Sequence, residues 1–275
     1  MSVQGLLRKY RLRPRKGLGQ NFLADSYHLS KIVEAAELDP ADTVLEIGPG
    51  LGTLTRRLAG QVPSGRVVAV EVDPNMVRAL QMELADLSNL TLVEADILGV
   101  DPPQLVRGGP YVVVANLPYY ITSAVLRHLL ESEPRPQRLV FTVQQEVGQR
   151  LVAGPGQMSL LAVSAQFYGK PRLVHKIPAG AFIPPPKVDS AVVRVDTFPT
   201  PPFAGDRPAL FFRVVKAGFS QKRKQLKNSL AASLGLPAGD VAGLMAEAGI
   251  DPRRRAQTLS LAEWAGLVDR LEGII

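Results

Sequence analysis

The first half of the chain alternates short apolar runs with segments in which apolar residues recur at every third or fourth position. Nearly continuous runs of Val, Ile and Leu are typical of strands covered on both faces. Asp25 and Asp73 each precede a segment with helical spacing and are predicted N-caps. The alternation predicts an α/β fold, an open, doubly wound sheet with helices on both faces. Five runs predict its strands: Thr43–Ile47, Arg66–Val70, Leu90–Val93, Tyr111–Ala115 and Arg138–Val143.

The pattern changes in the last third of the chain. Four prolines fall between Pro199 and Pro208, and proline removes backbone donors and interrupts helices, so this stretch is a predicted linker. Only helical periodicity follows it, ending with the capping box Ser260-x-x-Glu263. We therefore expect a domain over residues 1–200, whose residues 1–20 form a basic N-terminal segment. A small all-helical domain is expected over residues 207–275.

Charge and composition narrow the classes of function. The chain has 32 basic and 25 acidic residues, a net charge of +7, which favours a polyanionic partner, either nucleic acid or an acidic membrane. It has no cysteine, and its three histidines lie far apart in the sequence, so we expect no metal site. No apolar run is long enough to cross a bilayer, and no apolar segment follows the basic N-terminus as in a secretory signal. We expect a cytoplasmic protein without membrane contact.

Glycines and acids follow the predicted strands where a parallel sheet binds its ligands. The first strand leads into a turn containing Gly48 and Gly50, which lets a ligand approach the backbone. Position 53 is Thr, where a dinucleotide fingerprint has its third glycine. Glu71, after the second strand, suits ribose hydroxyls, and Asp96, after the third, suits an adenine amine. Acids without arginines indicate a nucleoside cofactor without phosphates, and S-adenosylmethionine fits this description.

The fourth strand ends in Asn116-Leu117-Pro118-Tyr119, the most informative string in the chain. The Asn116 side-chain oxygen and the Leu117 carbonyl can accept from one amino group, while Pro118 fixes the turn. Tyr119 can stack on a nucleobase. Two acceptors that draw the amine protons aside turn the nitrogen lone pair toward a sulfonium methyl. The string therefore predicts methylation of an exocyclic amine, with alignment supplying most of the rate.

Over nearly its whole length the chain resembles the ribosomal RNA adenine N6-dimethyltransferase family. The strings that carry the resemblance are Lys16–Leu23, Glu46–Gly52, Glu94–Asp96, Asn116–Tyr119 and Phe182–Ser190. The resemblance implies a Rossmann-like, S-adenosylmethionine-dependent methyltransferase sheet that dimethylates two adjacent adenosines of small-subunit ribosomal RNA during ribosome biogenesis. It implies that Asn21 and Leu23 help to close the cofactor site. It also implies cofactor contacts for Gly48, Glu71, Asp96 and Asn116, and a target adenine held between Tyr119 and Phe182.

The chain departs from the family pattern at two places. Tyr120 follows Tyr119 where many members have asparagine, and Arg255–Ser260 replaces an Arg-Pro-Glu pattern. The run Phe219–Leu226 contains three basic residues expected to contact RNA phosphates, Lys222, Arg223 and Lys224. The expected partner is small-subunit ribosomal RNA within an immature 30S-type subunit, bound by a monomer. Two alternatives remain open: a DNA amino-methyltransferase, and a non-catalytic RNA-binding assembly or transcription factor on the same fold.

Overall fold

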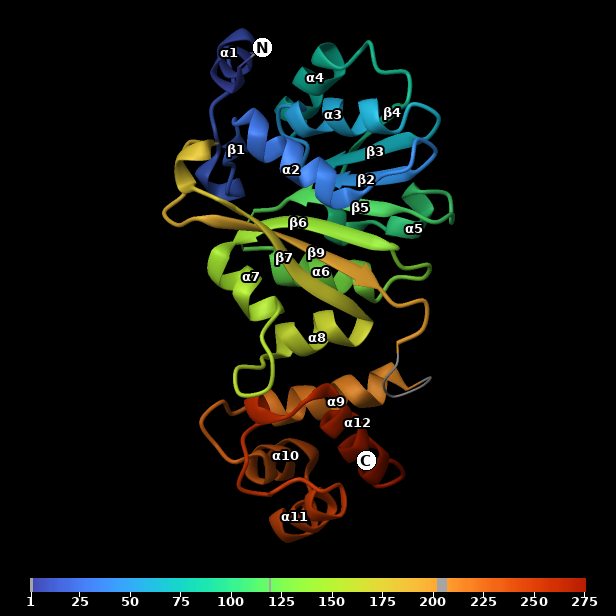
Figure 1. Ribbon diagram of the computed structural model, residues 1–275, viewed down its shortest axis with the longest axis vertical. Helices are drawn as coiled ribbons and strands as arrows, with labels where there is room; N and C mark the ends of the chain where they lie inside the picture. The colour runs from blue at the N-terminus through green and yellow to red at the C-terminus, as the bar shows by residue number, and fades with distance from the viewer. Residues whose placement is uncertain (1, 119, 202–206) are drawn as a thin grey trace. The chain divides into compact units, whose positions relative to one another are not determined.

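A computed structural model describes residues 2–118, 120–201 and 207–275, and it divides the chain into two compact units. The first unit contains Met1–Gly148 and Lys170–Thr197, and the second contains Gln149–Gly169 and Phe198–Ile275. Figure 1 shows the sheet in the first unit and the C-terminal helices in the second. No described helix combines the length and apolar composition needed to cross a bilayer.

A seven-stranded sheet forms the centre of the first unit, in the order β4-β3-β2-β5-β6-β9-β7. Strands β2 to β6 pair in parallel, and β9 pairs antiparallel with β6. Parallel pairing places the carboxyl ends of β2, β3, β4 and β5 at one edge of the sheet. The strands are β2 (Thr43–Ile47), β3 (Arg66–Glu71), β4 (Leu90–Glu94), β5 (Val112–Asn116), β6 (Arg138–Gln144), β7 (Gly169–Ile177) and β9 (Ser190–Thr197).

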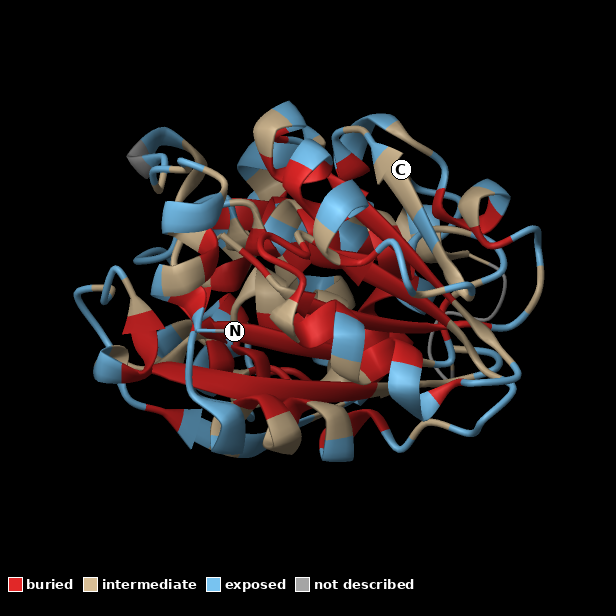
Figure 2. Cartoon of the chain, turned by 90° about the horizontal axis from the view of Figure 1, so that it is seen from above, coloured by how far each residue is buried: buried red, intermediate tan, exposed pale blue. Residues whose placement is uncertain are grey.

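Helices cover the sheet on both faces, as the apolar runs predict. Figure 1 shows α2 and α3 on one face and α6 on the other. In Figure 2 the strands are largely buried, whereas the helices turn an exposed side outward. The helices of this unit are α1 (Val3–Lys9), α2 (Ser26–Ala36), α3 (Thr53–Gln61), α4 (Pro74–Glu83), α5 (Pro102–Leu105) and α6 (Thr122–Leu130), and α7 (Gln145–Leu151) crosses into the second unit.

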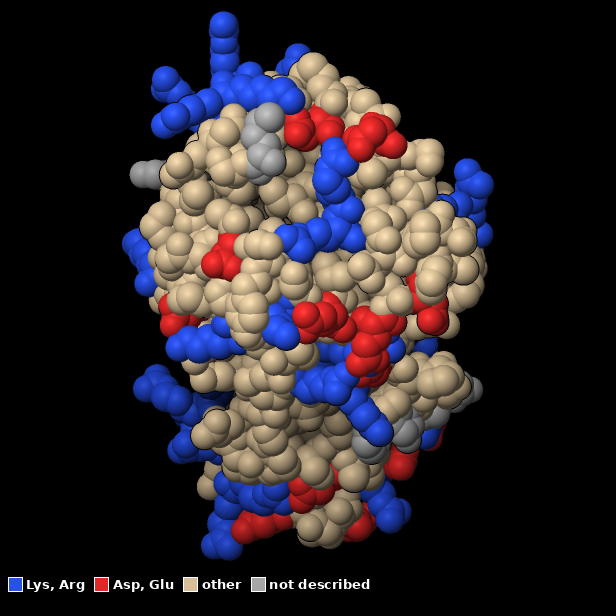
Figure 3. All heavy atoms as spheres, turned by 45° about the horizontal axis from the view of Figure 1, so that its top comes forward, with Lys and Arg blue, Asp and Glu red and all other residues tan. Residues whose placement is uncertain are grey.

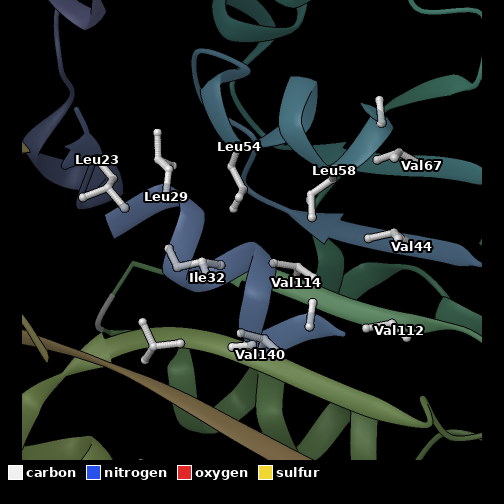
Figure 4. Close-up of a cluster of buried hydrophobic side chains, with 14 of the residues drawn as sticks. Leu23, Leu29, Ile32, Val44, Leu54, Leu58, Val67, Val112, Val114 and Val140 are labelled. Atoms are coloured by element: carbon white, nitrogen blue, oxygen red, sulfur yellow. The ribbon is translucent and has the colours of Figure 1, made fainter. Parts of the chain in front are cut away.

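One apolar cluster joins the helices to the sheet. Figure 4 shows Leu29 and Ile32 of α2 and Leu54 and Leu58 of α3 beside the valines of β2, β5 and β6. Each fully buried aliphatic side chain stabilises the fold by about 1.5–3 kcal/mol. The predicted N-caps are confirmed, since Asp25 accepts from the N–H groups of Tyr27 and His28, and Asp73 accepts from that of Asn75.

A second, two-stranded sheet ties the N-terminal segment to a distant loop. Strand β1 (Phe22–Leu23) pairs antiparallel with β8 (Phe182–Ile183). Short 3-10 turns lie at Lys16–Leu18, Ile97–Gly99, Ala179–Ala181 and Ala256–Thr258. The pairing brings the family string around Phe182 beside the one around Asn21.

All five predicted strands are confirmed, but the pattern gave no sign of β7 and β9. Strand β9 carries a charge inside the sheet: Arg194 is 5% exposed and donates to Asp196 and to the Ala35 carbonyl. Ion pairing therefore keeps a position buried that hydrophobicity alone would place in solvent. Strand β7 is the sheet edge, and most of its side chains are exposed or half-buried.

The second unit is helical, but it contains more of the chain than residues 207–275. Its helices are α8 (Leu160–Tyr168), α9 (Pro208–Phe219), α10 (Leu226–Leu234), α11 (Ala238–Glu247) and α12 (Leu261–Leu271). Helix α8 groups with it because Phe167 packs on Phe211 and Phe212, with ring centroids 4.6 and 5.0 Å apart. The boundary at Thr197 lies beside the prolines expected to form a linker, and the capping box of Ser260 and Glu263 is confirmed.

Candidate active site

A cavity of about 260 Å³ lies in the first unit at the carboxyl ends of β2, β3, β4 and β5. Every described residue that the sequence assigned to catalysis or to cofactor binding lines it. Tyr119 lies outside the described residues. The predicted residues along the cavity wall are Asn21, Leu23, Gly48, Gly50, Glu71, Asp96, Asn116, Leu117, Pro118 and Phe182.

The glycine turn brings backbone close to the cavity. Gly48 and Gly50 have φ values of +68° and +58°, which side chains larger than glycine rarely adopt. A Cβ on Gly50 would lie 2.9 Å from the Phe22 ring, so glycine also makes room for β1. A Cβ on Gly48 would lie 3.9 Å from the Asn116 carbonyl oxygen. The turn therefore stands directly beside the end of β5.

The Glu71 carboxylate is held in place by backbone donors. Its Oε1 accepts from the N–H groups of Val72 and Asp73 at 3.0 and 2.9 Å, and its Oε2 accepts from Gly50 at 3.1 Å. Burial raises the pKa of Glu71 despite these three donors, because the side chain is 6% exposed. The carboxylate is thus oriented before any ligand binds, with acceptor capacity remaining on Oε2.

Asp96 differs from Glu71 in its surroundings. It is exposed, and its Oδ1 accepts from the Leu98 N–H at 3.0 Å, which caps the following 3-10 turn. This bond fixes the carboxylate at the cavity wall, and its second oxygen is the one available to a ligand donor. Strands β3 and β4 are neighbours, so both acids stand at one edge of the sheet.

The turn after β5 presents an amide whose orientation is fixed. Asn116 Nδ2 donates to the main-chain carbonyl of Asn21 over 3.3 Å. This bond assigns the amide nitrogen to Asn21 and turns the Oδ1 acceptor the other way. The Pro118 carbonyl accepts from the Ile121 N–H at 3.2 Å, which closes the turn. The N-terminal segment therefore sets the direction in which Asn116 can accept.

Asp73 anchors that segment, a role the sequence did not reveal. Gln20 Nε2 donates to Asp73 Oδ2 over 3.1 Å, and the Arg15 guanidinium lies 3.5 Å from Asp73 Oδ1. Asp73 is 2% exposed and also caps α4. The sequence predicts the cap from the Asp-Pro pair, but only the folded chain brings Gln20 to it.

Glu46 is a second acid that sequence analysis did not assign. It belongs to β2, lines the cavity and is 1% exposed. Its Oε2 has no hydrogen-bond partner among the described residues. Burial raises the pKa of Glu46 to about 8, and the nearby Glu71 carboxylate adds to the rise. An acid within an otherwise apolar strand, directly before the glycine turn, was the signal available in the sequence.

Phe182 and two of the histidines lie in surroundings that the sequence did not reveal. Phe182 is 2% exposed, so its ring is at once a cavity wall and part of the apolar cluster. Two histidines that the sequence places far apart meet in the fold, with His28 Nδ1 and His175 Nε2 separated by 2.8 Å. In the described parts of the chain no three metal-ligating side chains gather into a possible ion site.

The charge of the cavity wall restricts its ligand. Among the described residues that line it, three are acidic, Glu46, Glu71 and Asp96, and none is Lys or Arg. A phosphate ligand would meet acidic side chains and no basic one there, whereas a cation would be attracted. Together with the topology of the sheet, this wall defines a Rossmann-like methyltransferase.

A family model described as "Ribosomal RNA adenine dimethylase" matches residues 11–272. The chain belongs to this family. It is 48% identical over 260 residues to the ribosomal RNA small subunit methyltransferase A of Dehalococcoides mccartyi strain ATCC BAA-2266, covering 94% of this chain and 89% of the relative. It is 45% identical to the protein of the same name from Moorella thermoacetica, covering 97% and 96% of the two chains.

The fold of the chain is also similar to those of solved structures. The 23S rRNA methyltransferase ErmE is 30% identical with a TM-score of 0.72, covering 92% of this chain and 100% of that one. A dimethyladenosine transferase from Plasmodium falciparum shares the fold with a TM-score of 0.75 at 23% identity, covering 91% and 97%. Both likenesses include the sheet and the helical unit, since both span nine-tenths of the chain.

The basic residues expected to contact RNA lie in the second unit. Lys222, Arg223 and Lys224 are exposed in the connection between α9 and α10. None of them forms an ion pair with another side chain in the described part of the chain. Figure 3 shows Lys and Arg side chains at several separate places on the visible face, with acids between them. The positive charge is distributed rather than gathered into one patch there.

Proposed function

We propose that the chain uses S-adenosylmethionine to dimethylate N6 of two adjacent adenosines in small-subunit ribosomal RNA. The observation that carries this proposal is the meeting of Asn116, Glu71 and Asp96 at one cavity. Family membership supports the same conclusion, because the matching model describes ribosomal RNA adenine dimethylases. The relatives at 48% and 45% identity are named for the small subunit, which supports that choice of target.

The cavity residues fit the proposed cofactor. In this proposal Glu71 accepts from the ribose hydroxyls and Asp96 from the adenine amine, while Asn21, Leu23, Gly48 and Gly50 enclose the remainder. The acidic wall suits a cofactor that carries a positive sulfur and no phosphate. When bound there, S-adenosylmethionine would supply a methyl group open to attack by a nucleophile, with the neutral thioether as the leaving group.

Asn116 and the turn after it prepare the adenine amine for that displacement. The Asn21 carbonyl holds the Asn116 amide nitrogen, so Oδ1 and the Leu117 carbonyl can accept hydrogen bonds from the N6 amine. Both accept in the first methyl transfer, and one accepts from the single remaining N6 hydrogen in the second. This geometry withdraws the nitrogen lone pair from the ring and aims it across the cavity. Phe182 and Tyr119 enclose the base, and the proton released from the methylated nitrogen passes to solvent. No strong base is required, because alignment lowers most of the barrier.

The helical unit supplies RNA affinity in this proposal. Lys222, Arg223 and Lys224 neutralise phosphates without reading sequence, and RNA shape selects the target loop. The substrate is ribosomal RNA inside an immature 30S-type subunit in the cytoplasm, and the enzyme acts as a monomer. The net charge of +7 favours such a polyanionic surface.

The test is methyl transfer to small ribosomal subunits that lack the two methylated adenosines. Asn116→Ala removes the side-chain acceptor, and we expect kcat to fall about 100-fold or more. Asn75→Ala is the matched control, because Asn75 lies on α4 outside the cavity lining and should retain full activity. Mass spectrometry of the RNA nucleosides identifies the product as N6,N6-dimethyladenosine.

Other outcomes of these measurements would contradict the proposal or indicate a different function. Full activity of Asn116→Ala contradicts the proposed amine recognition. Methylation of duplex DNA in preference to ribosomal subunits indicates a DNA amino-methyltransferase. Failure to bind S-adenosylmethionine in calorimetry, with retained binding to the subunit, indicates a non-catalytic assembly factor.

A further inference from the structure

Tyr120 stands at the cavity wall, yet most of its ring is in solvent. It is 65% exposed, whereas Leu117 and Phe182 at the same cavity are 2% exposed. A large aromatic ring left in water at the edge of a binding cavity is available surface for a planar ligand. Glu71, which is assigned to the cofactor, is only 6% exposed at the same cavity.

The Tyr120 ring nevertheless lies close to the N-terminal segment. A Cβ on Gly19 would lie 3.4 and 3.6 Å from two of its ring carbons and 3.2 Å from Pro118 Cβ. Gly19 has a φ of +61°, and its missing side chain lets the ring lie against the N-terminal segment. A backbone hydrogen bond from the Ile121 N–H to the Pro118 carbonyl closes the turn that carries Tyr120. One side of the ring therefore lies against the N-terminal segment, while most of its surface stays exposed.

We propose that Tyr120 stacks on the nucleotide next to the adenosine held at Asn116. The inference rests on the proposed function, in which the two target adenosines are adjacent. While one base occupies the cavity, its neighbour must lie at the mouth, where the Tyr120 ring stands. An aromatic ring binds any base by stacking, so it can hold either adenosine while the other reacts. Tyr120 is thus a positioning residue of the substrate side and not a cofactor contact.

The experiment compares full-length Tyr120→Ala and Tyr120→Trp with the unaltered chain, using undermethylated small subunits as substrate. Stacking persists from bound substrate to transition state, so its loss raises KM and leaves kcat unchanged. We expect Tyr120→Ala to raise KM about 10-fold or more. Tyr120→Trp should restore the original KM, because indole also stacks.

Tyr27→Ala is the matched control. Tyr27 is 59% exposed on α2 and does not line the cavity, so its removal should leave KM unchanged. Calorimetry with S-adenosylmethionine should give the same affinity for all four proteins. A melting temperature for each variant checks that folding is intact.

Three results would overturn the inference about Tyr120. An unchanged KM for Tyr120→Ala overturns the inference and leaves the proposed function standing. A parallel loss of S-adenosylmethionine affinity also overturns it, because Tyr120 would then belong to the cofactor site. If the unaltered chain transfers no methyl group to subunits, the proposed function fails first, and the inference fails with it.

Discussion

Replacing Glu46 by glutamine should change how the stability of the protein depends on pH. Glu46 is 1% exposed in β2, and burial raises its pKa to about 8 from an ordinary value of 4.5. Between these values the folded chain keeps the proton and the unfolded chain loses it. Since the folded state then binds more protons, its stability falls as pH rises from about 4.5 to about 8. Glutamine cannot ionise, so the variant escapes this loss.

The size of the effect follows from the same values. Each pKa unit corresponds to about 1.4 kcal/mol, and a rise from 4.5 to about 8 sets an upper bound of about 5 kcal/mol. Two thirds or less of this falls between pH 6 and pH 9, because the loss has begun before pH 6 and levels off above the folded pKa. We therefore expect the unaltered chain to lose about 3 kcal/mol more than Glu46→Gln over that interval.

Urea unfolding at pH 6, 7, 8 and 9 measures this difference. The quantity to compare is the change in unfolding free energy with pH, so a uniform destabilisation of the variant by the buried amide does not disturb the test. Glu94→Gln is the control, because Glu94 is exposed at the end of the neighbouring strand β4 and should leave the pH dependence unaltered. Parallel pH curves for the unaltered chain and Glu46→Gln would refute the reasoning.

Two further predictions concern the helical unit. A Cβ on Gly218 in α9 would lie 2.5 Å from the Trp264 ring, so Gly218→Ala should destabilise the protein by about 1–3 kcal/mol through overpacking. A Cβ on Gly243 in α11 would have no neighbour within 4 Å among the described residues, so Gly243→Ala should stabilise the protein by up to about 1 kcal/mol through helix propensity. Urea unfolding measures both, and effects of the same sign would contradict the packing argument. The second prediction concerns a triple alanine variant of Lys222, Arg223 and Lys224. It should lower the steepness with which log affinity for small-subunit RNA falls with log salt by up to about 3, since each phosphate contact contributes about 0.9. A filter-binding titration between 50 and 200 mM salt measures this slope, and an unchanged slope would show that the three residues do not contact the RNA.

The sheet could be predicted as far as hydrophobicity determines it. The runs that became β2, β3, β5 and β6 are buried on both faces, so nearly every position must be apolar and the signal is strong. In β9 the buried Arg194 depends on Asp196 and on the Ala35 carbonyl, and a sequence does not show which partner a charge will meet. The grouping of α8 with the C-terminal helices escaped prediction for the same reason, because Phe167 meets Phe211 only in the folded chain.

The site was predicted more fully than the fold around it. Parallel strands bring their carboxyl ends together, so Glu71, Asp96 and Asn116 could be assigned to one cavity without knowledge of their distances. The sequence does not show contacts between segments that are far apart along the chain. The bond from Asn116 to the Asn21 carbonyl decides which amide atom is the acceptor. Asn21 is brought there by the neighbouring strand pair of Phe22 with Ile183, two residues that lie 161 positions apart in the sequence.

The acidic cavity wall contrasts with the net positive charge of the chain, and the buried Glu46 bears on how the two can coexist. The chain carries a net charge of +7, yet the described part of its cavity wall has three acids and no base. Ionisation of all three would favour a cationic cofactor but would repel an RNA strand delivering its base to the same cavity. Because burial raises the pKa of Glu46 to about 8, this acid is largely neutral at pH 7, and the raised pKa of Glu71 acts in the same direction. The cavity wall therefore carries less negative charge at pH 7 than its three acids alone would give. A cation bound nearby would favour the ionised forms of both Glu46 and Glu71.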